Sequence, residues 1–298
     1  MVAFAWAEFF QQITSGLATG AIFASLALAL VLIYRTTDVV NFAQGEMATF
    51  TTYIAWSLMN HGLSYWPAFV LTLLIAFVSG IGIERVLIRP VEHRPEIVVV
   101  IMTIGLLIVI NGLTGWIWGA EVKAVDSPFP NKTIDVAGVA ISTQDIGTFC
   151  VCIASVVILW AFFRFTTLGL AMRSVAVNTD ASRLMGVRVG WMLALGWGLA
   201  AVLGAIAGLM AAPTAFLDPN MMLVILVYAF AAAVLGGIDS PIGAVVGGLI
   251  LGVTVNLLGR YVDLVGEELK LPTALAVLLL VLVIRPQGLF GRTIVRRV

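Results

Sequence analysis

The residues of this sequence that could do chemistry are a few polar side chains among many apolar ones. Asn41, Gln44 and Glu46 lie close together, whereas Asn111 and Asn256 each interrupt an otherwise apolar run. Amide and carboxylate groups can form hydrogen bonds with a polar solute, which is one interpretation of these five residues. The alternative for the two isolated asparagines is a hydrogen bond to a neighbouring helix.

Sequence motifs of common enzyme classes are missing. No Gly-Lys-Ser/Thr triplet is present, so the chain has no usual ATP-binding loop, and neither His-Glu-x-x-His nor Gly-x-Ser-x-Gly occurs. Cys150 and Cys152 are too close together for a disulfide framework and have no clustered histidines, so we interpret them as packing residues. We therefore expect no catalytic residue, no metal site and no cofactor in this chain.

Composition indicates the environment in which these side chains must be positioned. Charged residues make up 11% of the 298 residues and hydrophobic residues 61%, with a mean hydropathy of +1.09. A typical soluble domain has about 25% charged residues. A net charge of zero without a large basic patch also argues against a nucleic-acid partner. The composition predicts a polytopic membrane protein embedded in a lipid bilayer.

The charges divide the chain into apolar runs. A helix needs roughly 20 residues to cross a bilayer, and the 37-residue run 47–83 is long enough for two crossings. The runs lack the alternation of a membrane barrel strand. We expect an all-α bundle of about nine transmembrane helices, with eight to ten possible, in a single domain 1–298. The charge-free runs are 9–34, 47–83, 97–120, 146–163, 189–217, 219–238, 240–259 and 271–284.

The basic residues predict the orientation of the bundle. With nine crossings, four of them fall on one side and twelve on the other, which is the cytoplasmic side by the positive-inside rule. The N-terminus is then outside and the C-terminus cytoplasmic. The four are Lys123, Lys132, Arg260 and Lys270, and the twelve are Arg35, Arg85, Arg89, Arg94, Arg164, Arg173, Arg183, Arg188, Arg285, Arg292, Arg296 and Arg297.

The interiors of the apolar runs hold almost no ionisable groups. Carriers driven by protons or sodium ions usually place such groups at mid-membrane. The pattern therefore favours a channel, or one subunit of a larger machine whose energy comes from a partner.

The stretch 34–50 mixes polar groups with hydrophobic side chains between two apolar runs. A plain loop would not need those hydrophobic residues, so we interpret the stretch as a broken helix. Irregular backbone at membrane depth is tolerated only where protein or a water-filled path surrounds it. It predicts an element of a translocation path, and the alternative is an ordinary interfacial turn with an Asn cap.

The segment 164–188 contains four arginines and predicts a short amphipathic helix over 180–185. Asn178 or Thr179 can cap its start and Gly186 can end it. An apolar face between arginines suggests a docking element for a soluble partner, whereas the alternative is a solvated loop. The predicted docking residues are Arg173, Asn178, Asp180, Ala181, Arg183, Leu184, Met185 and Gly186.

Glycines mark closely packed helices. Pro241 suits the first turn of a helix, and Asp239 and Ser240 can cap it. The result is a tight helical hairpin over 230–252, in which the predicted structural glycines are Gly236, Gly237, Gly243 and Gly247. Spacing of small residues by four also occurs at Gly16/Gly20, Gly204/Gly208 and Gly248/Gly252.

Four segments together resemble the permease subunits of bacterial branched-chain amino acid importers of the ATP-binding cassette class, the LivH-like family. They are Asn41-Phe-Ala-Gln-Gly-Glu46, Arg183-Leu-Met-Gly-Val187, Ala233-Val-Leu-Gly-Gly-Ile-Asp-Ser240 and Arg285-Pro-Gln-Gly-Leu-Phe-Gly291. The resemblance covers nearly the whole chain. Two positions depart from the family pattern, since Gln44 stands where His is usual and Asp239 where Gly is usual.

The resemblance implies a type II-like importer permease in the bacterial inner membrane that translocates leucine, isoleucine and valine. It also implies a second permease subunit of similar fold, two ATPase subunits that bind the ATP, and a periplasmic substrate-binding protein. The segment 173–187 would be the coupling segment. Asn41, Gln44, Glu46, Asn111 and Asn256 would line the substrate path.

Other functions remain open from the sequence. Urea or a short-chain amide is an alternative substrate of the same class of importer. A passive facilitator would make 164–188 a mere loop, and an intramembrane enzyme would require a paired-residue site that the sequence does not offer.

Overall fold

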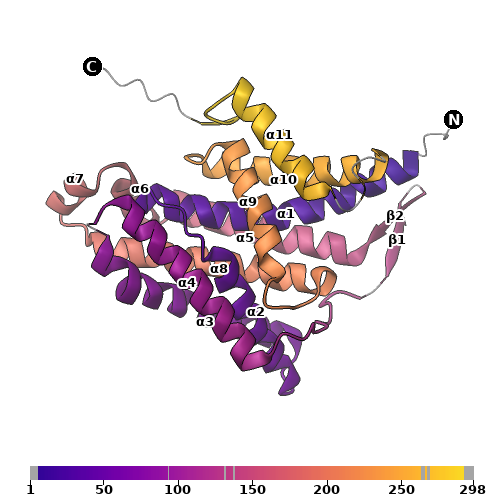
Figure 1. Ribbon diagram of the computed structural model, residues 1–298, viewed down its shortest axis with the longest axis horizontal. Coiled ribbons are helices and arrows are strands. Elements are labelled where there is room, and N and C mark those ends of the chain that lie inside the picture. Colours follow the sequence, from indigo (N-terminus) through magenta and orange to yellow (C-terminus); the bar gives the residue numbers. More distant parts are fainter. Residues whose placement is uncertain are drawn as a thin grey trace.

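The computed structural model describes residues 6–92, 94–130, 132–136, 138–262, 266 and 269–291, and in these residues it is a bundle of α-helices with one small β-hairpin (Figure 1). Six helices are long and apolar enough to cross a membrane: α1 (Trp6–Thr37), α3 (Tyr65–Ile83), α4 (Glu96–Trp118), α5 (Thr143–Phe165), α8 (Val189–Ala215) and α10 (Pro241–Tyr261).

Three shorter helices complete the bundle and two more lie outside it. The three are α2 (Gln44–Asn60), α9 (Met221–Gly236) and α11 (Lys270–Ile284), so each of the nine predicted crossings corresponds to a described helix, and six of these are long enough to span a membrane. The other two are α6 (Thr167–Val177) and α7 (Thr179–Leu184). Strands β1 (Thr133–Val136) and β2 (Val139–Ser142) pair antiparallel, with Thr133 opposite Ser142. The all-α, polytopic prediction is confirmed.

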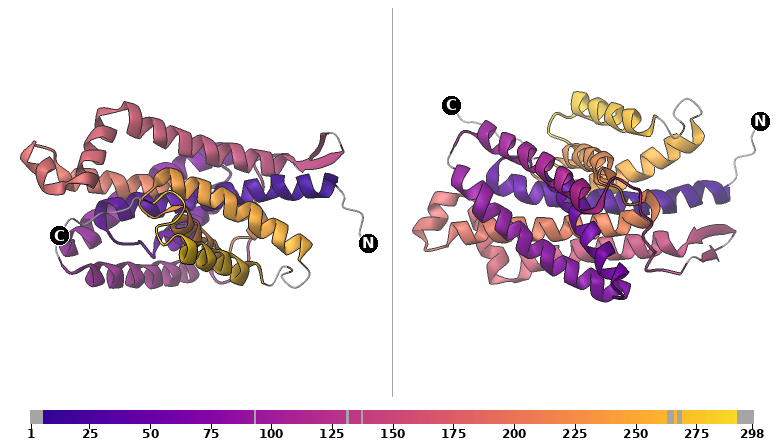
Figure 2. Two further views of the ribbon diagram at one scale, coloured as in Figure 1. Left: turned by 90° about the horizontal axis from the view of Figure 1, so that it is seen from above. Right: turned by 60° about the horizontal axis from the view of Figure 1, so that its bottom comes forward.

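Helix α1 is the central element of the bundle. It is buried over most of its length and runs lengthwise between α5 and α10 (Figure 2). Against α10 the backbones touch directly, because a Cβ atom added to Gly252 would overlap the Cα of Gly20. Gly16 and Gly248 are similarly crowded by backbone atoms of the facing helix. The glycine spacing of the sequence thus marks a seam along which the backbones of the two helices are in direct contact.

Helices α9 and α10 form a tight hairpin whose contact face is made of glycine. A Cβ atom on Gly243 would overlap the carbonyl oxygen of Gly236. One turn later, a Cβ atom on Gly247 would overlap the carbonyl oxygen of Ala232 and lie 3.0 Å from the Gly236 amide nitrogen. Gly243 and Gly247 therefore face α9, whereas Gly248 and Gly252 of the same helix face α1. The sequence shows both spacings on α10 but does not tell which neighbour each pair faces.

The turn between α9 and α10 is built from a glycine and a hydroxyl cap. Gly237 has a φ of 104°, a conformation that favours glycine. Of the two predicted caps, Asp239 and Ser240, the second is the one used, since the Ser240 hydroxyl accepts a hydrogen bond from the Gly243 amide at 3.0 Å. Pro241 is the first residue of α10, as expected.

The segment 285–291 packs against the turn end of this hairpin. The amides of Leu289 and Phe290 donate to the carbonyl oxygens of Leu235 and Gly236 at 2.8 and 2.9 Å. These carbonyls belong to the last turn of α9, which has no partners of its own for them. Residues 285–291, called the tail below, therefore supply a backbone cap to α9, which lies about 50 residues earlier in the chain. Arg292, Arg296 and Arg297 lie outside the described residues.

We expect Gly237→Ala to destabilise the protein by on the order of 2 kcal/mol, because a positive φ disfavours any side chain. The added methyl would also lie 2.7 Å from the Gly291 amide nitrogen. Thermal unfolding of the purified protein in detergent measures the change. Gly105→Ala in α4 is the matched control, since nothing lies within 4 Å of its Cβ position. Equal melting temperatures for both variants would contradict this account of the tail.

Candidate functional site: a buried polar cluster and an exposed helical segment

The break between α1 and α2 is enclosed by protein. Residues 38–43 are not helical, and Val39, Asn41 and Ala43 are buried. The side-chain oxygen of Asn41 accepts from the Ala43 amide at 3.1 Å, and its amide nitrogen donates to Gln44 Oε1 at 3.2 Å. Gln44 in turn donates to the carbonyl oxygen of Ala200 in α8 at 2.8 Å. The two polar side chains thus hold the irregular backbone against α8.

Glycines allow α2 to approach α8 this closely. A Cβ atom on Gly204 would lie 2.7 Å from Gln44 Nε2, and one on Gly208 would overlap the hydroxyl of Thr52. The predicted Gly204/Gly208 pair therefore packs α8 directly beneath the first turns of α2.

The side chain of Glu46 lies at the start of α2, two residues after Gln44, and is fully buried. Its Oε2 accepts a hydrogen bond from Asn111 Nδ2 in α4 at 3.2 Å. The same nitrogen is 3.1 Å from the carbonyl oxygen of Pro219 and 3.1 Å from Asn220 Oδ1, both in the turn between α8 and α9. Glu46 Oε1 has no hydrogen-bond partner among the described residues. One acceptor atom of this carboxylate is thus both buried and unpaired within the described part of the chain.

The structure brings four of the five predicted path residues together at the start of α2, and the fifth lies elsewhere. Asn256, in α10, lines a separate polar pocket of about 460 Å³. Position within an apolar run does not determine which neighbour a side chain faces, so the sequence could not separate Asn256 from Asn111. The other residues of that pocket are Glu8, Gln11, Gln12, Gly259, Arg260, Gly266 and Lys270.

The turn of residues 216–220 is a part of the site that the sequence analysis missed. Leu217 pairs with Lys123 through two backbone hydrogen bonds, which fixes the turn against the loop after α4. The signal was present, because Asp218 and Asn220 interrupt two long apolar runs.

The segment 164–188 forms an exposed projection at one end of the bundle (Figure 1). Asn178 caps α7 by accepting from the Ala181 amide at 2.8 Å, and Gly186 follows the helix with a φ of 82°. Leu184 is 90% exposed and Met185 84% exposed. The predicted short helix is therefore present, one residue earlier than expected, with its apolar side chains uncovered.

The segment also contains a helix that the sequence analysis did not foresee. Helix α6 fills 167–177, with Thr166 as its cap and a buried Met172 and Val175.

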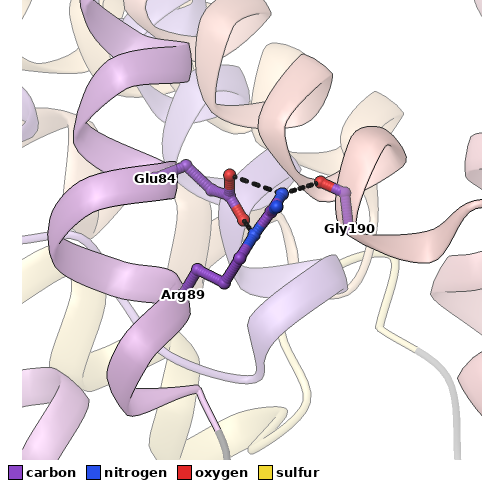
Figure 3. A network of polar contacts seen from close by, with 3 residues as sticks. All are labelled: Glu84, Arg89 and Gly190. Atoms are coloured by element: carbon purple, nitrogen blue, oxygen red, sulfur yellow. Dashed lines mark hydrogen bonds and ion pairs between the residues drawn. The ribbon is translucent and has the colours of Figure 1, made fainter.

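An ion pair just after α3 is hydrogen-bonded to the start of α8, directly after the projection (Figure 3). The buried Glu84 lies in a π-helical turn, Glu84–Ile88, and binds Arg89 at 3.1 and 3.3 Å. Arg89 Nη2 also donates to the carbonyl oxygen of Gly190 at 2.5 Å. Gly190 is the second residue of α8, directly after the projection. Beside it, the Arg85 guanidinium lies 3.8 Å from the ring centre of Trp191. Sequence reasoning used these arginines only for orientation.

A membrane-spanning helical bundle with a polar cluster between its helices and a projecting helical segment has the architecture of a membrane transport protein. A sequence profile of the family described as branched-chain amino acid transport system / permease component matches residues 12–284, and the chain belongs to this family. The resemblance seen in the four sequence motifs is confirmed.

Curated relatives match along nearly their whole length. The permease protein LivH of the high-affinity branched-chain amino acid transport system of Salmonella typhimurium is 30% identical, over 97% of this chain and 98% of the relative. The corresponding protein BraD of Pseudomonas aeruginosa is 31% identical, over 98% of each chain. Among solved structures, PsaBC from Streptococcus pneumoniae in complex with Fab shares the fold, with a TM-score of 0.50 and 14% identity over 95% of this chain and 97% of that one.

We expect Arg89→Gln to lower the free energy of unfolding by about 2 kcal/mol, because Glu84 would remain buried without its cation. The loss is smaller than for a fully enclosed pair, since the Arg89 side chain is 38% exposed. Thermal unfolding of Arg89→Gln, Glu84→Gln and the double variant forms a complete cycle. The double variant should recover part of the loss, and strictly additive effects would show that the pair is not coupled.

Proposed function

We propose that this chain is the membrane permease subunit of an ATP-binding cassette importer for branched-chain amino acids. The observation that carries the proposal is full-length similarity to LivH and BraD, whose names state that activity. The chain would be a single transmembrane domain in the bacterial inner membrane, with its N-terminus outside and its C-terminus cytoplasmic.

The energy would come from partners. Two ATPase subunits would bind the ATP and dock on the coupling segment 164–188, where Leu184 and Met185 present an uncovered apolar face. A second permease subunit of similar fold would complete the path, and a periplasmic binding protein would deliver the substrate. This chain would itself carry no catalytic residue and no cofactor.

The contacts of the described residues suggest how a displacement of the projection by the ATPase subunits would be transmitted to the other helices. The ion pair of Arg89 with Glu84, and the bond of Arg89 to Gly190, would make α3 follow the start of α8. Helix α8 also carries Ala200, which holds Gln44 at the start of α2. Movement of α8 would therefore displace α2 relative to α4, and the bond between Glu46 and Asn111 would open. Such rigid-body rocking is a common form of alternating access.

The path would run past Asn41, Gln44, Glu46 and Asn111. A branched-chain amino acid has a charged ammonium group and an apolar side chain. The buried carboxylate of Glu46 suits the former and the surrounding apolar helices suit the latter. Specificity could rest largely with the binding protein, so the path need not bind the substrate tightly.

We expect Leu184→Asp to reduce ATP-dependent leucine uptake roughly tenfold, because a charge in the centre of a docking face disrupts it. Uptake by proteoliposomes of the purified importer and co-purification of the ATPase subunits are the two measurements. Leu184 is exposed, so folding should be unchanged, and Leu184→Met is the control that keeps an apolar side chain. Uptake that needs no ATP in either variant would indicate a facilitator instead. A binding protein that prefers urea to leucine would overturn the substrate assignment.

Glu46→Gln should lower leucine uptake roughly tenfold while leaving ATPase docking intact, because a hydrogen bond to a charged group contributes about 1.5–3 kcal/mol. The substitution keeps the shape of the side chain. Asn256→Ala is the comparison variant, and we expect a smaller effect because Asn256 faces the separate pocket. Equal losses would extend the path to that pocket, whereas undiminished uptake by Glu46→Gln would remove Glu46 from the path.

A further inference from the structure

A cavity of about 540 Å³ opens between α1, α5, α6 and α10, away from the polar cluster at the start of α2. Its inner wall is apolar and comes from three long helices. The wall residues include Leu28 and Leu32 of α1, Val156 and Val157 of α5, and Val245 and Val246 of α10.

Three arginines from three different helices line the same cavity: Arg35 of α1, Arg164 of α5 and Arg173 of α6. Asp239 is the carboxylate among the lining residues, so the described lining carries two net positive charges. Arg173 Nε is buried and has no hydrogen-bond partner within the described part of the chain. An arginine nitrogen that is buried and unpaired is costly unless an acceptor reaches it.

The charged and apolar parts lie one above the other along the helices. Leu28 precedes Arg35 by seven residues in α1, which is about 10 Å of helix. Trp160, one turn before Arg164, is half exposed, as tryptophans at the boundary of a membrane commonly are. A ligand that fills the cavity must therefore combine an anionic end at the arginines with an apolar body about 10 Å or more in length.

We propose that this cavity binds one anionic phospholipid, with its phosphate among Arg35, Arg164 and Arg173 and an acyl chain along the α1–α5–α10 wall. Basic pockets between transmembrane helices on the cytoplasmic side bind such headgroups in other membrane proteins. A free phosphate would match the arginines but leave the apolar wall uncovered. A helix of a second copy would cover the wall but leave Arg173 without an acceptor.

The lipid would have a structural consequence for the projection. Arg164 and Arg173 are on either side of the sharp turn from α5 to α6, while Arg35 lies in the last turn of the central helix α1. A shared phosphate would fasten the base of the projection to the core of the bundle. The inference needs only the membrane location of the chain, so it stands or falls separately from the proposed substrate.

Native mass spectrometry of the full-length protein, purified in its native assembly from discs of phosphatidylcholine and phosphatidylglycerol, tests the site. We expect one retained phosphatidylglycerol per chain. The double variant Arg35→Gln/Arg164→Gln should retain it roughly 25-fold less, since each of the two arginines near a membrane surface contributes about a factor of five. Arg94→Gln is the matched control, because Arg94 is an exposed arginine that does not line the cavity.

A second variant, Val157→Trp, fills the apolar part and keeps all three arginines. It should also lose the phosphatidylglycerol. If this variant retained a free phosphate ion instead, only the anion would be bound, and the lipid assignment would be overturned. Size-exclusion profiles and melting temperatures identify variants that fail to fold. Equal lipid retention by wild type and both cavity variants would overturn the proposal. So would a disulfide cross-link between Val157→Cys residues of two permease chains, because the wall would then be a subunit interface.

Discussion

The constraint on which this structure depends is that backbone groups inside a membrane must find their partners within the protein. The bundle has several places where a helix stops short, and at each one a neighbour supplies the missing bonds. Asn41 and Gln44 stabilise the break before α2. Asn111 donates to the carbonyl of the buried Pro219, and residues 285–291 supply amides to the end of α9. Most of these repairs join elements that are distant in the sequence.

The same repairs place the polar groups that a transport path requires. A continuous helix would keep Gln44 and Glu46 facing whatever neighbours its periodicity gave them. Because α1 ends and α2 begins inside the protein, these side chains lie at a meeting point of α2, α4, α8 and the 216–220 turn. Glu46 is then held by a single amide, and its second oxygen remains without a partner among the described residues. The bonds of Gln44 stabilise the fold, whereas the free oxygen of Glu46 contributes nothing evident to stability.

Local features of this protein could be predicted from its sequence, whereas contacts between residues distant in the sequence could not. The caps at Asn178 and Ser240 and the stop at Gly186 depend on side chains within a turn of one another. The glycine spacing predicted a close helix contact but not that α1 and α10 form it. The bond of Glu46 to Asn111 depends on the packing of three helices, and a single sequence does not contain that information. For the same reason Asn256 and Asn111 looked alike until their neighbours were known. The role of Arg89 was hidden because its partners are a buried carboxylate and a backbone carbonyl of α8.

The cap on α9 implies an order of assembly during synthesis. Helices α9 and α10 are synthesised before residues 285–291. Until those residues are made, the carbonyls of Leu235 and Gly236 lack the amides of Leu289 and Phe290. They receive their amide partners only after α11 and the segment that follows it have been made. Residues 285–291 therefore cap a helix that was made earlier, and a chain interrupted within α11 would leave the carbonyls of Leu235 and Gly236 without these amides.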